Sequence, residues 1–441
     1  MLLVAREIIF IMKTNKKQTY LFVIMVIAIA LLGIFHFVGK RFIHGALWTG
    51  DCNTYWKQLA YSIRGYNLKN VSKYNLVIDS IGEVSGSIMM PWARLIGNLL
   101  IPGFLPYKIA CVYYYSLMMV CTLLLAKKIY EYFVKNEVIK ITDGSTVVEK
   151  ISNVCILLVT ISITIAPFYW EDAFNVGNIG NVCSLCALLA AFYIEDKPNI
   201  ASALLVISCI KPQIGAIFLV LLFFKRKYRI VFGSGIALVV LSIISELYTF
   251  IMTKARNISY VSDGMTSILT GYMNTDPSSE DMKWHYYFGI FTPLNGYGVS
   301  NIIVSILSAL LGILILFLIV RYIEKNQVLS DDYIFLFGIT SIICMVWAYK
   351  SISDEIIVIL MNVVIILLWK YSSKNISDVL LIFIALFIFN CEVFRFWIKQ
   401  LGIYDFVYAD SYDVLLCLIC LILTIYRLKK CICNRKNQDN L

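Results

Sequence analysis

Charged residues are scarce in this chain. They make up 15% of its 441 residues, whereas 60% are hydrophobic, so little polar material is available to cover a water-soluble surface. No polar stretch is long enough to close a core of its own, which excludes a set of separate soluble domains. The mean hydropathy of +0.79 means that most of the chain must avoid water. These features predict an all-α, polytopic membrane protein with a single membrane domain over residues 1–441.

The sequence also lacks several catalytic signatures. No HExxH motif, P-loop or G-x-S-x-G elbow is evident, so metalloprotease, ATPase and serine-hydrolase activities have no support. The 13 Cys lie mainly in apolar runs, and their two C-x-x-C spacings have no zinc or redox context. The net charge of +10 comes from Lys and Arg in short loops, which is typical of membrane-orientation signals and not of nucleic-acid binding.

About ten apolar runs approach the roughly 20 residues that a membrane-spanning helix needs. They lie at about 20–38, 107–126, 150–168, 178–194, 229–252, 299–321, 333–349, 355–371, 377–396 and 412–427. The first run follows three lysines and has no small-residue cleavage site after it, so it is expected to remain as a span. Two further segments, 88–102 and 199–224, are ambiguous, and each would reverse the orientation of everything after it.

The segment 88–102 is short for a span. It has about 15 residues, is interrupted by Pro91 and Arg94, and is followed by further prolines. If it crossed, the lysine-rich loop 127–150 would face outward, against the positive-inside rule. We therefore expect a short amphipathic or re-entrant segment inside a first outer loop, 39–106.

The apolar stretch 204–224 carries Lys211 and Pro212 in its middle. A straight helix would place the basic loop 225–229 outside the cell. A turn at Lys211–Pro212 instead leaves about 13 Lys and Arg in cytoplasmic loops and about six in the longer outer loops. This favours a broken hairpin over 199–224, with Lys211 in a protein-lined cavity below the outer surface. The alternative is a proline-kinked helix whose lysine snorkels or pairs with a carboxylate.

The resulting topology places both chain ends in the cytoplasm: the N-terminal segment 1–19 and a basic tail, 428–441. The long loops 39–106 and 253–298 then share the outer side, and any chemistry is expected there.

Two residues in these loops are candidates for proton transfer. Asp51, in WTGDCNTYW, follows the first span by about a dozen residues, and a partly desolvated carboxylate is a suitable general base. His285, in KWHYYFGIFTP, is one of three His and could act as an acid, as a base or as a hydrogen-bond donor to a phosphate. An ordinary loop aspartate and an aromatic membrane-interface segment are the respective alternatives.

The order of these features resembles glycosyltransferase family 87, the polyprenol-phosphate-mannose-dependent mannosyltransferases and their relatives in the GT-C superfamily. The resemblance covers roughly residues 20–370. It is carried by Gly50, Asp51 and Tyr55, by Gly65 and Asn67, by Pro91, and by Lys211, Pro212 and Gln213. One motif departs from the family: where G-Q-x-N is frequent, this chain has NVGNIGN, with Gly177, Asn178 and Asn181. Asn keeps the amide but is one carbon shorter than Gln.

The resemblance implies an enzyme that transfers a mannose-like sugar from a polyprenyl-phosphate donor to a lipid or polysaccharide acceptor at the outer face of the cell membrane. Asp51 is then the general base for the acceptor hydroxyl. Lys211, Arg94 and His285 would stabilise the charge on the leaving phosphate. Tyr55, Asn178 and Gln213 would contact the substrates. Because the leaving group is a lipid phosphate, neither a metal nor another cofactor is expected.

Two other functions remain open on the residues alone. A polysaccharide polymerase or ligase acts on similar lipid-linked sugars, but such proteins usually rely on outer-loop arginines, and the second long loop offers only Arg256. A transporter or flippase for lipid-linked sugars is expected to carry ionisable residues deep in several spans. The clear candidates here are Lys211 and Glu246.

Overall fold

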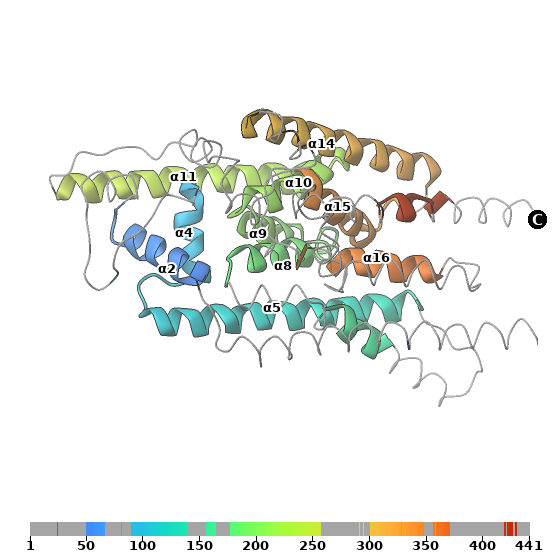
Figure 1. Ribbon diagram of the computed structural model, residues 1–441, viewed down its shortest axis with the longest axis horizontal. Coiled ribbons are helices and arrows are strands. Elements are labelled where there is room, and N and C mark those ends of the chain that lie inside the picture. Colours follow the sequence, from blue (N-terminus) through green and yellow to red (C-terminus); the bar gives the residue numbers. More distant parts are fainter. Residues whose placement is uncertain are drawn as a thin grey trace, which may run out of the picture.

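The structure is a computed structural model. It describes residues 24, 50–66, 81, 90–138, 156–164, 177–256, 291, 294, 300–327, 329–347, 356–357, 359–370, 419, 421–426 and 428–429. All regular secondary structure in these ranges is helical, which confirms the all-α expectation. The main helices are α2 (Gly50–Ile63), α4 (Pro91–Leu100), α5 (Tyr107–Lys135), α8 (Gly180–Ala190), α9 (Pro198–Ser208), α10 (Pro212–Phe224), α11 (Tyr228–Ala255), α14 (Asn301–Asn326), α15 (Tyr333–Trp347) and α16 (Ile359–Lys370) (Figure 1).

Three of these helices, α5, α11 and α14, are long and apolar enough to cross a membrane. Each covers all or nearly all of one of the apolar runs expected to span. The 28 residues of α11 rise about 42 Å, which exceeds a hydrocarbon core of about 30 Å. Its exposed apolar side chains recur every three or four residues and include Phe232, Ile236, Val239 and Ile243. This stripe gives α11 a lipid-facing side.

The helices α5 and α11 run along the long axis of the molecule, with α8 and α9 between them and α10 beside α11 (Figure 1). Here α8 packs against α5, and α9 packs against α11. The core continues into α15, where the rings of Phe218 and Phe337 stack 4.8 Å apart. A Cβ on Gly338 would lie 2.6 Å from the carbonyl oxygen of Leu360, so this glycine allows α15 and α16 to approach closely.

The ambiguous stretch 199–224 forms a hairpin. The helix α9 ends at Ser208 and α10 begins at Pro212, and their far ends lie together. There the Lys227 ammonium lies 2.9 Å from Glu195, and Arg229 donates a hydrogen bond to Asn199 over 3.2 Å. A continuous helix would place residues 199 and 229 about 45 Å apart. The expected hairpin is therefore confirmed, and the kinked-helix alternative is wrong.

Local sequence explains why the chain turns there. Lys211 has an extended backbone, with φ −104° and ψ 95°, and Pro212 occupies the first position of α10, where no N–H is needed. A Cβ on Gly215 would lie 2.7 Å from the backbone nitrogen of Cys209. Only glycine permits so close a return, so the break and the close approach come from the same short sequence.

The helix α4 is too short to span. Its ten residues rise about 15 Å, roughly half of the hydrocarbon core. It packs against α11 and α2 at one end of the molecule (Figure 1). After it, a Cβ on Gly103 would lie 2.4 Å from the backbone nitrogen of Ala60, so the turn into α5 presses on α2. The segment 88–102 thus contains a short buried helix, in agreement with the expectation that it does not cross.

Several expected features lie outside the described residues. These are the first span at 20–38 apart from Ile24, most of the outer loop 253–298, and the apolar run at 377–396. The count of about ten crossings and the division of the chain into loops therefore stay predictions.

Candidate functional site

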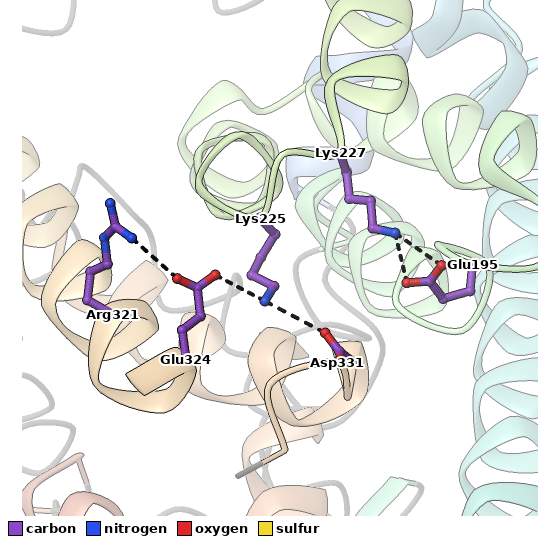
Figure 2. Close-up of polar contacts among 6 residues, drawn as sticks. All are labelled: Glu195, Lys225, Lys227, Arg321, Glu324 and Asp331. Atoms are coloured by element: carbon purple, nitrogen blue, oxygen red, sulfur yellow. Dashed lines mark hydrogen bonds and ion pairs between the residues drawn. The ribbon is translucent and has the colours of Figure 1, made fainter. Parts of the chain in front are cut away.

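One end of the helix bundle, here called the charged end, brings together the loop after α10, the α14–α15 connection and the end of α5. Lys225, which follows α10, lies 3.2 Å from Glu324 and 4.0 Å from Asp331, at the two sides of the α14–α15 connection (Figure 2). The Tyr132 hydroxyl of α5 donates a hydrogen bond to the Asp332 carboxylate. The loops 225–229 and 321–332 therefore lie on the same side, as the charge argument requires.

The hairpin tip, residues 209–212, points away from the charged end. Since α10 has 13 residues, the tip lies about 20 Å from that end. Two indoles hold it. Trp92 of α4 donates to the carbonyl of Cys209 over 2.7 Å, and Trp347 at the end of α15 donates to the carbonyl of Gln213 over 2.8 Å. Lys211 is half-buried between these two anchors.

The start of α2 meets the start of α8 at this same end, here called the tip end. Asp51 lies in the first turn of α2, and its side chain is outside the described part of the structure. The next residue, Cys52, would contact a Cβ on Gly177 at 2.8 Å, and Gly177 has a left-handed backbone with φ +65°. The Cys52 sulfur also lies 3.3 Å from that of Cys111 on α5. These contacts hold the first turn of α2 against α5 and α8.

Asn178, in the motif that departs from the family pattern, helps to start α8. Its side-chain oxygen accepts a hydrogen bond from the backbone N–H of Gly180 over 2.9 Å, and the Tyr114 hydroxyl donates to its backbone carbonyl. A short amide reaches the nearby N–H groups of a helix start, as Asn does in helix capping. The shorter side chain thus has a structural role at this position.

Arg94 is buried in α4 and paired with Glu246 of α11, with 3.2 Å between the guanidinium and the carboxylate. The ion pair connects the short helix to the long one. Tyr55, also expected at the site, is only 7% exposed and belongs to the apolar core beside α2. His285 lies outside the described residues.

The structure therefore brings Arg94, Asn178, Lys211 and Gln213 to the tip end, together with the helix turn that carries Asp51. Sequence reasoning missed the two tryptophans that hold the hairpin. Trp92 stands two residues before Arg94, and Trp347 closes an apolar run, which is a frequent position for Trp at a membrane interface. Their partners could not be read from the sequence. Within the described part of the chain, no three His, Cys, Asp or Glu side chains gather as a metal site.

Replacing Glu246 by Gln is expected to destabilise the protein by about 2 kcal/mol, because a buried arginine loses its counter-charge. The effect stays below that of a fully buried pair because the Glu246 side chain is 25% exposed. Thermal unfolding of the purified protein in detergent measures it. Glu131→Gln, at the exposed pair with Lys128, is the matched control and should change nothing measurable. An unchanged unfolding midpoint in Glu246→Gln would contradict a stabilising role for the pair.

Comparison with known proteins bears on this arrangement. A family model described as glycosyltransferase family 87 matches residues 96–346, more than half of the chain. The match includes Asn178, Lys211 and Gln213 and the position of His285, and it begins after Asp51, Tyr55 and Arg94. Searches of curated proteins and of solved structures found no match. The chain belongs to glycosyltransferase family 87, and it is a membrane glycosyltransferase.

Proposed function

We propose that the protein transfers a mannose-like sugar from a polyprenyl-phosphate donor to a hydroxyl of a lipid or polysaccharide acceptor, in the manner of GT-C enzymes. Family membership supports the class of reaction. The observation that carries the proposal is the position of Lys211. It lies at a broken hairpin tip inside the membrane domain, at the same end as α4 and the first turn of α2.

In the proposed reaction, Asp51 takes the proton from the acceptor hydroxyl. The oxygen attacks the anomeric carbon of the donor sugar, and the bond from that carbon to the phosphate oxygen breaks. The electron pair leaves with the lipid phosphate, whose charge rises. Lys211 stabilises this charge, and the effect of an ammonium group is larger where protein has replaced water. Base and cation act on opposite faces of the sugar, as an inverting displacement requires.

The remaining residues support the substrates in this proposal. His285 adds positive charge for the phosphate, and Arg94 does so from its ion pair with Glu246. Asn178 and Gln213 contact the sugar and the acceptor, and the buried Tyr55 supports the wall of their sites. No metal is required, because a lipid monophosphate can leave with cationic side chains alone. We therefore expect the sugar-transfer activity to be retained after treatment with the chelator EDTA.

Analysis of lipid-linked and polymeric glycans in a strain without this protein tests the function. We expect one sugar to disappear from a glycolipid or polysaccharide, and the wild-type gene to restore it. Shortened polysaccharide chains of unchanged composition would instead indicate a polymerase or ligase. Accumulation of a complete lipid-linked sugar on the cytoplasmic side would indicate a flippase. Either outcome would overturn the proposed transfer reaction.

The proposed sidedness places the tip end at the outer face and both chain ends in the cytoplasm. We expect a cysteine in place of Gln213, beside Pro212 at the hairpin tip, to react with a membrane-impermeant thiol reagent from outside, in a background without the 13 native Cys. A cysteine in place of Arg226, which is exposed at the charged end, should react only from inside. The reverse pattern would show that the orientation is inverted.

A further inference from the structure

A cavity of about 510 Å³ lies at the charged end, away from the proposed catalytic site. It is bounded by the end of α10, the start of α11 and the last turns of α14. Its lining combines aromatic rings with charged side chains. The charged members are Lys225, Arg226, Arg321 and Glu324.

Three cations and one carboxylate leave this lining with an excess of two positive charges. Figure 2 shows Glu324 between two of the cations, 3.2 Å from Lys225 and 3.7 Å from Arg321. Asp331 approaches Lys225 at 4.0 Å, but it is 91% exposed and is not part of the lining. A single carboxylate is thus shared by two cations while a third lies beside them. The cavity is suited to an anion.

Arg226 is the third cation, and its backbone adopts the left-handed conformation, with φ +57°. This conformation disfavours side chains other than those of Gly, Asn and Asp. The Arg226 side chain is exposed, and it forms no ion pair with the residues that the structure describes. The left-handed backbone belongs to the C-cap of α10, where the N–H of Lys227 donates to the carbonyl of Leu222. Among the described residues, no acidic side chain is paired with the Arg226 guanidinium.

The aromatic part of the lining gives the cavity an apolar wall. The rings of Phe224 and Phe317 meet edge to face at 5.4 Å, and Phe223 and Tyr228 meet at 5.6 Å. Next to the cavity, α11 exposes Phe232 and α14 exposes Leu314 and Leu318, among other apolar side chains. The basic cavity is thus continuous with exposed apolar faces of α11 and α14.

We propose that this cavity binds the phosphate headgroup of an anionic membrane lipid, with the acyl chains along the exposed faces of α11 and α14. Basic pockets between membrane helices are typical sites for such headgroups. The forked donors of Arg226 and Arg321 suit phosphate oxygens. A soluble phosphate would make the same polar contacts but would leave the apolar faces unused. The bound lipid would connect α11 to α14 at the charged end.

The test uses the full chain, purified in a neutral detergent and titrated with phosphatidylglycerol, with phosphatidylcholine of the same acyl chains, or with inorganic phosphate. Native mass spectrometry and the thermal unfolding midpoint report binding. We expect phosphatidylglycerol alone to bind and to raise the midpoint. The double variant Arg226→Asn and Arg321→Gln should bind it about 30-fold more weakly, since each basic residue contributes measurably to headgroup attraction.

The variants are chosen to leave the fold intact. Asn tolerates the left-handed backbone at position 226, and the Arg321 side chain is 61% exposed. The single variant Arg226→Asn, at an exposed position, should bind phosphatidylglycerol about fivefold more weakly. The matched control removes two exposed charges of α5 at the same end, Lys127→Gln and Lys135→Gln, and should stay within about threefold of the wild type.

Three results would overturn the proposal. Equal binding of phosphatidylglycerol and phosphatidylcholine would remove the role of headgroup charge. Equal losses in the cavity variant and in the α5 control would reduce the effect to the net charge of the surface. Binding of inorganic phosphate as tight as that of the lipid, and equally sensitive to the two arginines, would make the cavity a site for free phosphate.

Discussion

Replacing Asp51 by Asn is expected to lower sugar transfer by about 10²- to 10⁴-fold, the range that a positioned general base contributes. The amide has nearly the shape of the carboxylate, but at neutral pH it cannot accept the proton of the acceptor hydroxyl. Asn is also well tolerated near the start of a helix, so α2 should form as before. The loss is therefore assigned to chemistry and not to folding.

The measurement has two parts: the glycan product in cells that carry only the variant, and the initial rate in isolated membranes at matched protein levels. Glu131→Gln serves as the control, since that carboxylate is exposed on α5 at the charged end. It should retain the wild-type rate. An intact glycan product at a wild-type rate with Asp51→Asn would remove this residue from the catalytic role.

Replacing Lys211 by Met is expected to lower the rate by about 10²- to 10³-fold, as the loss of one preorganised charge-stabilising group does in other enzymes. Met has a similar length and no charge. The turn depends on Pro212 and on the absence of a side chain at Gly215, so the hairpin should form without the lysine. Lys211→Arg keeps the charge with a bulkier group and should retain part of the activity.

Donor kinetics separate this role from a structural one. If Lys211 acts mainly on the leaving phosphate, kcat should fall more than the KM for the lipid-phosphate sugar rises. Lys127→Met, an exposed lysine of α5, is the control and should change neither constant. Wild-type kinetics in Lys211→Met would mean that the ammonium group serves only the solvation of the tip.

Much of the architecture follows from patterns that are local in the sequence. The apolar runs predicted α5, α11 and α14 because hydropathy over about 20 residues reports directly on the ability to cross a bilayer. The prolines of the segment 88–102 indicated that it is too broken to span, and α4 is indeed a short helix. Loop charge predicted the hairpin at Lys211. A hairpin leaves the later basic loops in the cytoplasm, whereas a straight helix would place them outside.

The pairings that build the tip end are not local. Arg94 and Glu246 are 152 residues apart in the chain, and Trp92 and Cys209 are 117 apart. No sequence pattern connects the members of either pair. The sequence therefore suggested separate roles for Arg94, as a phosphate ligand, and for Glu246, as an ionisable residue in a span. Burial was equally hidden for Tyr55, whose motif suggested a substrate contact and whose side chain lies in the core.

The sequence by itself thus determined the membrane class, the break at Lys211–Pro212 and the order of motifs that resembles the family, since hydropathy, proline chemistry and loop charge act over neighbouring residues. Only the tertiary structure decided which indoles hold the hairpin tip and that Arg94 is paired. It alone brought Phe224 and Phe317 together at the basic cavity. The physical reason is that such contacts depend on how helices pack, and packing selects partners by shape and distance in space, which spacing along the chain does not encode.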